Sequence, residues 1–471
     1  MKTDTIAAIA TAVSDSGIGI IRISGDEAVE IADKVYRSRS GKKRLVNVES
    51  HTIHYGYIYD RDELIDEVMV AVMKAPNTYT KEDTVEIDCH GGVLVMTKIL
   101  ETVVRNGCRL AEPGEFTKRA FLNGRIDLSK AEAVMDLIQS KNEFALKASV
   151  NQLKGSVFDK VRSLRDDILY EIAFIESALD DPEHISLDGY TERLREKTEK
   201  IQSELGRLIA SSDNGKMLRD GIDTVIVGKP NAGKSSLLNL LVGEERAIVT
   251  SVAGTTRDVL EESIKLHGVG LNIIDTAGIR STDDAVEKIG VEKARKYAKD
   301  ADLIVYVVDA SCALDENDEE IMELIADKKV IVLLNKTDLE QVVSEDEIVR
   351  KLTDVSSNAD SNELAHLSVI KTSTKENTGI DVFERTVRQL FFGGEIAVND
   401  EIYITNQRHK QALAEASESM ELVLRSLDDQ MPEDFYSIDL MSAYAALGRI
   451  IGEEVGEDLV NEIFSKFCMG K

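Results

Sequence analysis

The sequence of 471 residues has no tryptophan, only 5 prolines and only 4 cysteines. Cys89, Cys108, Cys312 and Cys468 are scattered without a Cys-x-x-Cys pair, which argues against a disulfide framework and against a zinc site. We therefore expect a reducing, cytoplasmic setting. The scarcity of proline is typical of a helix-rich protein, because proline interrupts helices.

Long apolar runs are also absent. No stretch reaches the ~18 residues that a membrane-spanning helix requires. Asp4 stands just before the apolar stretch 5–13, whereas a secretory signal begins with positive charge. The sequence therefore predicts a soluble protein without a secretory signal.

Positive charge is in short supply. The chain has 57 lysines and arginines against 86 aspartates and glutamates, which gives a formal net charge of −29. A protein that binds RNA over its whole surface should be basic, because phosphate contacts supply most of the affinity. A nucleic-acid partner would need a local basic patch here, or a second protein that holds it.

Hydrophobic residues make up 43% of the chain, and its length allows about three domains. Short alternating strands come first, then helical periodicity, then apolar strands separated by helices, and finally helical periodicity again. Either helical piece alone would lack a partner for its apolar stripe, so we predict one helical domain split by an inserted α/β domain. The predicted boundaries are 1–118 for the N-terminal α+β domain, 119–216 and 394–471 for the helical domain, and 217–393 for the α/β domain.

Individual elements can be predicted within these segments. A single apolar stripe over 157–179 predicts a long helix that Pro182 should end, and helices are also expected over 412–427 and 440–467. The predicted strands are 18–24, 53–59 and 84–89 in the first domain and 225–227, 271–274, 303–308 and 330–334 in the third.

The strongest motif is the segment Gly228–Ser235, which matches the pattern GxxxxGK[ST]. It directly follows the strand 224–227 and opens an apolar helix, which is the context that a phosphate-binding loop requires. Glycines let backbone N–H groups curl around phosphate oxygens. Lys234 would reach the β- and γ-phosphates, and Ser235 would offer its hydroxyl to Mg²⁺.

The base is indicated by Asn335–Asp338, which follows the strand 330–334. An aspartate carboxylate accepts the two N–H donors of guanine, and adenine would leave it unpaired. Asp338 therefore predicts selectivity for guanine. The segment Ser373–Lys375 occupies the place of a guanine loop that normally reads Ser-Ala-Lys, and it differs at its middle residue.

Two more segments complete the set. Asp275–Gly278 closes a strand and would place Gly278 near the γ-phosphate, and Gly254–Asp258 supplies Thr256 as a second Mg²⁺ ligand. Each motif is weak alone, but four in this order predict a Ras-like GTP-binding domain. The residues expected at the nucleotide are Asn231, Ala232, Gly233, Lys234, Ser235, Ser236, Thr250, Ser251, Val252, Ala253, Gly254, Thr255, Thr256, Asp275, Thr276, Ala277, Gly278, Asn335, Lys336, Asp338, Ser373, Thr374 and Lys375.

The catalytic apparatus differs from that of many small GTPases. The residue after Gly278 is Ile279, where others carry the glutamine that orients the attacking water. The sequence also identifies no arginine finger, a group worth ~10³–10⁵ in rate. Another group must place the water and offset the developing charge.

Taken together, Asn231 and the segments 248–258, Asp275–Arg280 and Cys468–Lys471 resemble the TrmE-type GTPases over the whole length of the chain. The resemblance implies a potassium-activated enzyme in which K⁺ replaces the arginine finger and two G domains face each other. It implies Lys234 and Glu287 as catalytic residues, Glu287 by orienting water. The K⁺ ligands it implies are Asn231, Thr250, Val252 and Thr255. From the residues alone, Asn231 could equally be a turn residue, and a solvated surface acid is the alternative interpretation of Glu287.

The N-terminal segment carries no motif of general mechanism. In 84–89, Glu86 and Asp88 share one strand face, and Arg22 faces away from its isoleucine neighbours. A carboxylate and a guanidinium could bind a folate, and two solvated strand faces are the alternative. The family resemblance implies a domain for tetrahydrofolate binding and dimerisation. The folate-contact positions it implies are Arg22, Glu86, Arg125 and Lys471. Many relatives have lysine in place of Arg125. The family also has a Pro-Pro-Gly turn near its start, and residues 13–17 stand in its place here.

Cys468 lies three residues from Lys471 in a tail that resembles the Cys-x-Gly-Lys end of the family. The resemblance implies that this tail points into the folate site, which would allow a reactive role for Cys468. A small apolar residue is the alternative interpretation.

The resemblance also implies an activity and partners. A dimeric GTP hydrolase would form the 5-carboxymethylaminomethyl group on the wobble uridine of tRNA, using 5-formyltetrahydrofolate or another tetrahydrofolate derivative. It would bind GTP and GDP with Mg²⁺ and K⁺, and would join the FAD-dependent protein MnmG in a heterotetramer that shares the tRNA contact. Two alternatives stay open: a ribosome-assembly GTPase that binds rRNA, and a switch that binds GTP without significant turnover.

Overall fold

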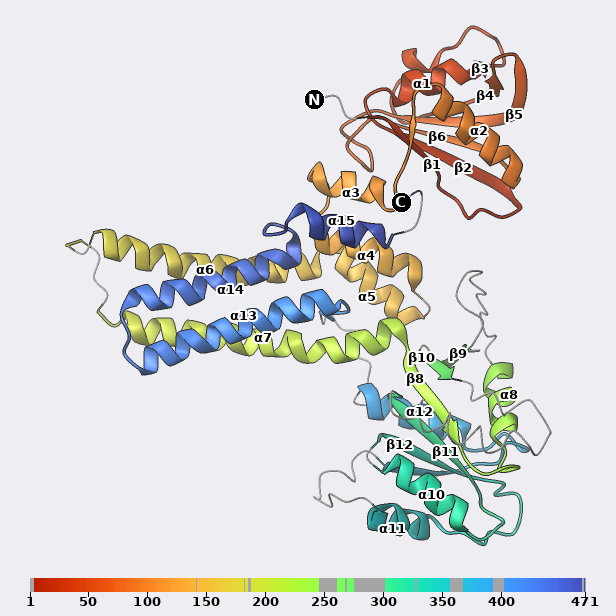
Figure 1. Cartoon of the computed structure of the whole chain (residues 1–471), viewed down its shortest axis with the longest axis vertical. Coiled ribbons are helices and arrows are strands. Elements are labelled where there is room, and N and C mark those ends of the chain that lie inside the picture. Colours follow the sequence, from red (N-terminus) through yellow and green to blue (C-terminus); the bar gives the residue numbers. More distant parts are fainter. Residues whose placement is uncertain are drawn as a thin grey trace. The chain divides into compact units, whose positions relative to one another are not determined.

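The computed structural model describes residues 4–140, 142–181, 183–184, 188–244, 261–266, 269–274, 301–326, 328–355, 367–392, 402–467 and 470 (Figure 1). These residues form two compact units. Unit 1 comprises Met1–Met135, Gln152–Gln202 and Glu415–Lys471, and unit 2 comprises Asp136–Asn151 and Ser203–Ala414. Among the helices described, none is long and apolar enough to cross a membrane.

Unit 1 begins with a seven-stranded sheet in the order β3-β4-β5-β6-β2-β1-β7. One face is covered by α1 (Ala28–Val35) and α2 (Val93–Arg105). The strands are β1 (Ile6–Ile9), β2 (Ser16–Ser24), β3 (Tyr36–Ser38), β4 (Thr52–Asp60), β5 (Glu63–Met73), β6 (Thr84–Gly91) and β7 (Arg109–Leu110); the 3₁₀ turn η1 spans Leu45–Asn47.

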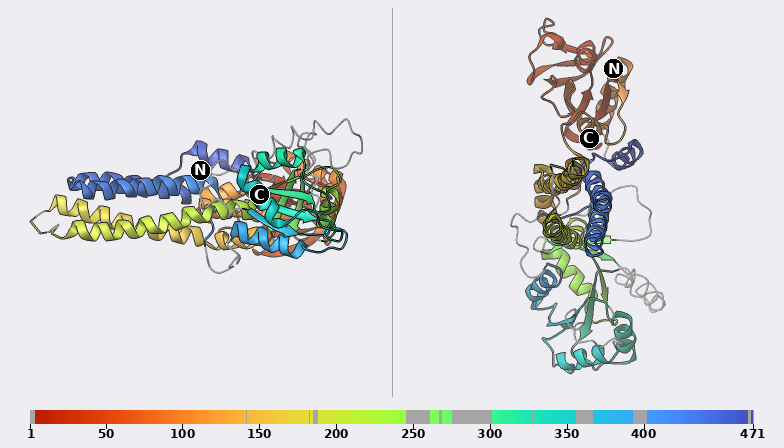
Figure 2. Two further views of the ribbon diagram at one scale, coloured as in Figure 1. Left: turned by 90° about the horizontal axis from the view of Figure 1, so that it is seen from below. Right: turned by 90° about the vertical axis from the view of Figure 1, so that its left-hand side faces the viewer.

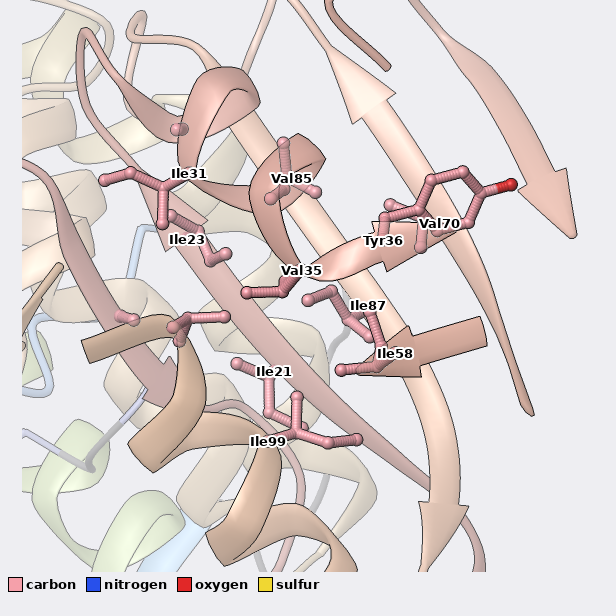
Figure 3. Packing of buried hydrophobic residues seen from close by; sticks show 14 of the residues in the cluster. Ile21, Ile23, Ile31, Val35, Tyr36, Ile58, Val70, Val85, Ile87 and Ile99 are labelled. Atoms are coloured by element: carbon pink, nitrogen blue, oxygen red, sulfur yellow. The ribbon is translucent and has the colours of Figure 1, made fainter. Parts of the chain in front are cut away.

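Alternation along the strands builds the core of this sheet. Ile21 and Ile87 are fully buried and pack against Ile99 of α2 (Figure 3). Their neighbours Arg22 and Glu86 point to the opposite face, because successive side chains of a strand alternate. The uncovered face of the sheet therefore carries the polar residues singled out above.

The long helices come from distant parts of the chain. α6 (Ser156–Asp180) and α14 (Glu433–Ile451), both in unit 1, lie side by side, as do α7 (Tyr190–Asp220) and α13 (Gln407–Asp428) (Figures 1 and 2). The Gln202 amide donates to the Ser417 hydroxyl over 3.0 Å. The split of the helical domain by an insertion is confirmed.

The helical segment predicted over 440–467 is confirmed, with a break inside it. The segment 440–467 is two helices, because α14 ends at Gly452, which has a φ of +91° and donates its N–H to the Gly448 carbonyl. A Cβ at Gly452 would come within 2.8 Å of the Phe121 ring. The chain restarts as α15 (Glu457–Ser465). The short helices α3 (Glu115–Leu122), α4 (Leu128–Gln139) and α5 (Glu143–Lys154) connect the sheet to α6 along the chain.

Unit 2 contains a six-stranded sheet in the order β13-β12-β11-β8-β10-β9, parallel except for β9. One face packs on α8 (Lys234–Glu244) and α12 (Ile380–Phe392), the other on α10 (Glu316–Ile325) and α11 (Glu345–Val355). The strands are β8 (Ile222–Val227), β9 (Glu261–Leu266), β10 (Val269–Ile274), β11 (Leu303–Asp309), β12 (Val330–Asn335) and β13 (Leu367–Lys371). This arrangement confirms the predicted α/β domain.

Candidate functional site

The loop between β8 and α8 has a backbone that only glycine permits at two positions. Gly228 has a φ of +148° and Gly233 a φ of +107°. A Cβ on Gly228 would collide with the carbonyl oxygen of Val307, and one on Gly233 with the amide of Asn335. The loop is therefore pressed against its neighbours, as a phosphate loop needs to be.

Lys234 begins α8 at the end of this loop. Its ammonium donates to the carbonyl oxygens of Gly228 (2.5 Å) and Lys229 (2.7 Å). Ser235 follows in the first helical turn and is exposed. A helix N-terminus with a lysine and a serine in its first turn is suited to an anionic ligand with a divalent cation.

Asn335 joins three of the predicted motifs. It is 1% exposed, and its amide donates to the carbonyl oxygen of Ala232 over 2.8 Å. Its side-chain oxygen accepts from the backbone N–H of Thr374 over 3.1 Å. The phosphate loop, the segment Asn335–Asp338 and the segment Ser373–Lys375 are thereby brought together. Because the Thr374 bond uses its main chain, the departure from alanine at this position leaves the contact in place.

Asp338 carries the charge expected of a guanine reader. The hydroxyl of Ser373 donates to its Oδ1 over 2.8 Å, and the ammonium of Lys375 lies 3.7 Å from its Oδ2. The Ser373 hydrogen bond, together with Lys375, holds the pKa of Asp338 below its ordinary value. The carboxylate therefore stays ionised and can only accept hydrogen bonds.

Lys336 points back into the domain. It has a φ of +63°, and its ammonium lies 2.6 Å from Asp309 Oδ2. Burial alone would raise the pKa of Asp309, but the hydrogen bond from Lys336 and those from Ser311 hold it below its ordinary value. Sequence reasoning missed Asp309; its position at the carboxyl end of the parallel strand β11 was the available signal.

Several predicted residues lie outside the described part of the chain. They include one of the two Mg²⁺ ligands and three of the four K⁺ ligands. These residues are Thr250, Ser251, Val252, Ala253, Gly254, Thr255, Thr256, Asp275, Thr276, Ala277, Gly278, Ile279, Glu287, Cys468 and Lys471.

In the N-terminal sheet, Arg22 and Glu86 form an ion pair across neighbouring strands, with Arg22 Nε 2.7 Å from Glu86 Oε1. Arg22 also donates to the carbonyl oxygen of Gly470 over 3.1 Å, so the end of the chain reaches the same face. Asp88 lies on this face as well. Burial, and the charge of Glu86, raise the pKa of Asp88.

Arg125 lies beside Tyr79, which packs against a small apolar cluster that includes Phe116, and Arg22 lies 5.7 Å from the centre of the Phe116 ring. The guanidinium of Arg125 stacks 4.7 Å from the centre of the Tyr79 ring. It lines a hollow of ≈ 470 Å³ together with Met73, Lys81 and neighbouring residues of the 76–79 turn. Arg22 and Glu86 are thus joined directly, whereas Arg125 is linked to Arg22 through Tyr79 and Phe116.

Comparisons with known proteins decide the family. A model described as the MnmE helical domain matches residues 128–468, and one described as the GTP-binding protein TrmE N-terminus matches residues 5–125. The tRNA modification GTPase MnmE of Lachnoclostridium phytofermentans is 58% identical over 471 residues, with 100% of both chains covered. The chain belongs to the MnmE family of tRNA modification GTPases. The MnmE proteins of Acetivibrio thermocellus (48% over 476 residues, 100% of both chains) and Bacillus subtilis (47% over 472 residues, 99% of this chain and 100% of the relative) agree.

Membership of the MnmE family confirms the resemblance to TrmE-type GTPases and the fold class. The MnmE helical-domain match runs through the inserted unit, consistent with helices from both sides of it packing together. It also favours tRNA modification over the ribosome-assembly alternative. The domain boundaries at 118, 216 and 393 and the roles of individual site residues stay predictions.

Proposed function

We propose that this protein hydrolyses GTP and, with the FAD-dependent partner MnmG, forms the 5-carboxymethylaminomethyl group on the wobble uridine of certain tRNAs. The observation that carries the proposal is the contact of three motifs at Asn335, beside an ionised Asp338. This arrangement suits guanine recognition, and it occurs in a chain 58% identical to a named tRNA modification GTPase.

The reaction in this chain is phosphoryl transfer to water. Lys234 would leave its two carbonyl partners for the β- and γ-phosphates, and its charge would stabilise the transition state. Mg²⁺ would be held by Ser235 and Thr256, and it would offset charge on the phosphates when bound. The exposed Ser235 in the first turn of α8 fits this role.

We propose that GTP hydrolysis depends on potassium, because the sequence identifies no arginine finger. K⁺ would be held by Asn231, Thr250, Val252 and Thr255, and it would supply the missing positive charge. Asn231 fits, because it is exposed and lies within the phosphate loop, where its φ of +63° is in the left-handed region. Glu287 would position the attacking water in place of a glutamine.

The one-carbon unit would come from 5-formyltetrahydrofolate or another tetrahydrofolate derivative. Arg22, Glu86 and Lys471 would hold it on the uncovered face of the N-terminal sheet, and Arg125 would contact it from its position beside Tyr79. The fit rests on the side-chain exposures of 18% for Arg22 and 24% for Glu86, which leave both groups accessible. Cys468 would lie near the same face, because it is two residues from Gly470 in the sequence.

A homodimer is consistent with this same face. Ile53, Tyr55 and Met69 of β4 and β5 are 66%, 48% and 46% exposed, and apolar residues gathered on a sheet face commonly mark an interface. Two copies would then join MnmG in a heterotetramer. The net charge of −29 favours a division of labour in which MnmG supplies much of the tRNA contact.

The test is GTP turnover by the whole protein in KCl and in NaCl, with Asn231→Ala and the exposed Asn239→Ala on α8 as its matched control. We expect turnover in KCl only, lost in Asn231→Ala and kept in Asn239→Ala. Equal and near-zero rates in both salts would instead favour the non-catalytic switch. Nucleoside analysis of tRNA from a deletion strain should show loss of the modified wobble uridine, and unchanged tRNA would overturn the proposed pathway role.

A further inference from the structure

Lys229, the second residue of the phosphate loop, is held at its side chain by α10. Its ammonium lies 2.6 Å from Asp318 Oδ2 and 3.0 Å from Asp315 Oδ2. Asp315 is the N-cap of α10 and forms a capping box with Asp318. The second residue of the loop is therefore tied to the first turn of a helix that follows another strand.

Asp318 is the centre of this cluster. It is 1% exposed and accepts hydrogen bonds from the Tyr306 hydroxyl (2.8 Å) and from the backbone N–H of Asp315 (3.0 Å) in addition to Lys229. Tyr306 is itself fully buried. A buried carboxylate needs a cation close by, and removing one partner of such a pair is strongly destabilising. Lys229 is the cation in contact with it.

The main chain of Lys229 contacts the nucleotide site directly, because its carbonyl oxygen accepts a hydrogen bond from the ammonium of Lys234 over 2.7 Å. One residue is thus anchored to α10 by its side chain and presents its backbone to the lysine that would bind the phosphates. The same β11–α10 connection also supplies Asp309, the partner of Lys336 on the base side of the site.

We propose that Lys229 is a positioning residue of the phosphate loop, which it fixes to α10 through Asp318, and that this anchor sets the affinity for guanine nucleotides. The anchor holds the loop in its binding conformation before the nucleotide arrives, and such preorganisation raises affinity. It acts on binding of substrate and transition state alike, so it should change KM more than kcat. The inference rests on the proposed function for both of its readouts, GDP binding and GTP turnover.

The test compares Lys229→Met, Lys229→Arg and Asp318→Asn in the whole protein, by fluorescence titration with labelled GDP and by GTP turnover. We expect Lys229→Met and Asp318→Asn to weaken GDP binding by about tenfold or more, as loss of a charge-assisted hydrogen bond commonly does. KM should rise in parallel while kcat stays within about twofold. Lys229→Arg should restore most of the affinity.

Lys351→Met is the matched control, because Lys351 makes an exposed 2.6 Å ion pair with Glu319 on the same helix without touching the loop. It should bind GDP normally. Tyr306→Phe removes one hydrogen bond from Asp318 and should give a smaller loss, which keeps the test available if Asp318→Asn does not fold. The double variant Lys229→Met/Tyr306→Phe should be less than additive, because both changes act on one network.

Three results would overturn the proposal. The first is a GDP affinity in Lys229→Met equal to that of the unaltered protein. The second is weakened GDP binding by Lys229→Met while Asp318→Asn and Tyr306→Phe both bind GDP normally. Lys229 would then act on the phosphates by its charge alone. The third is an equal loss in Lys351→Met. Failure of the unaltered protein to bind GDP would instead contradict the proposed function.

Discussion

The guanine-nucleotide site of unit 2 and the Arg22–Glu86 site of unit 1 are assembled in different ways. The first is made by loops at the carboxyl ends of adjacent parallel strands, where Asn335 links neighbouring turns. The second pairs side chains on antiparallel strands and adds Gly470 from the far end of the chain. Loop backbone conformation controls the first site, and side-chain pairing across strands controls the second. Substitutions should therefore act on the two sites by different routes.

The largest effect is expected from Gly233→Ala. Gly233 has a φ of +107°, and a Cβ there would collide with the Asn335 amide that joins the three motifs. We expect GDP binding to fall by more than ~100-fold, because a misplaced binding loop loses most of its preorganised contacts. Isothermal titration with GDP measures this. Gly206→Ala, with open space around it in α7, is the control, and normal binding by Gly233→Ala would contradict the backbone argument.

Asp338→Asn should change the preferred base from guanine to xanthine. The amide keeps one acceptor for guanine N1–H but sets a donor against the 2-amino group, so GTP affinity should fall by roughly 10²–10⁴. Xanthine carries an oxygen at that position, so xanthosine triphosphate should bind better than GTP does. Competition against labelled GDP measures both, with the exposed Asp354→Asn of α11 as control. Retained guanine preference would remove Asp338 as the base reader.

Arg22→Gln tests the other side of the comparison. It removes the 2.7 Å ion pair with Glu86 and the bond to the Gly470 carbonyl. We expect the affinity for 5-formyltetrahydrofolate to fall by roughly tenfold or more, with GDP affinity unchanged. Arg37→Gln is the control, because Arg37 stacks 4.1 Å from the Tyr59 ring on the same sheet. Equal folate binding by the unaltered protein, Arg22→Gln and Arg37→Gln would exclude Arg22 from the folate site.

The smallest effect is expected from Gly470→Ala. Gly470 has a φ of +84°, and a Cβ would collide with the Ile9 carbonyl oxygen. The tail should shift against the sheet and weaken folate binding by about two- to fivefold, because the 3.1 Å bond from Arg22 would be lost and the proposed contact of Lys471 displaced. Gly456→Ala, which has open space around it, controls for a general effect of the substitution. A loss larger than that of Arg22→Gln would mean that the tail itself binds most of the ligand.

The sequence predicted the nucleotide site better than the rest because its motifs are contiguous and sit at strand ends. The positions of Lys234, Asn335 and Asp338 follow from spacing alone. The third partner of Asn335, Thr374, was placed by its motif, but the use of its main chain depends on three-dimensional packing. Lys229 carries no motif signal for a side-chain role, because its side-chain partners Asp315 and Asp318 lie at the start of α10, far along the chain.

The fold was predicted in outline and missed in detail. β5 escaped because acidic residues at 63, 66 and 67 mask its alternation, although it pairs with both β4 and β6. The helix break at Gly452 was not predicted, because a glycine alone does not end a helix. The close approach of Phe121 explains why glycine is required there, and that contact is not visible in a sequence. The side-chain pairing of Arg22 with Glu86 likewise required the strand register.

The pairing of α6 with α14 has a consequence for biosynthesis. The apolar stripe of α6 leaves the ribosome well before its partner, because the whole insertion is translated between Asp180 and Glu433. At ~5–20 residues per second, that interval lasts about 12–50 s. The inserted domain can fold during this time, whereas the part of α6 that packs on α14 must wait uncovered. A nascent chain stalled after the insertion should therefore be a ready substrate for chaperones that bind exposed apolar helices.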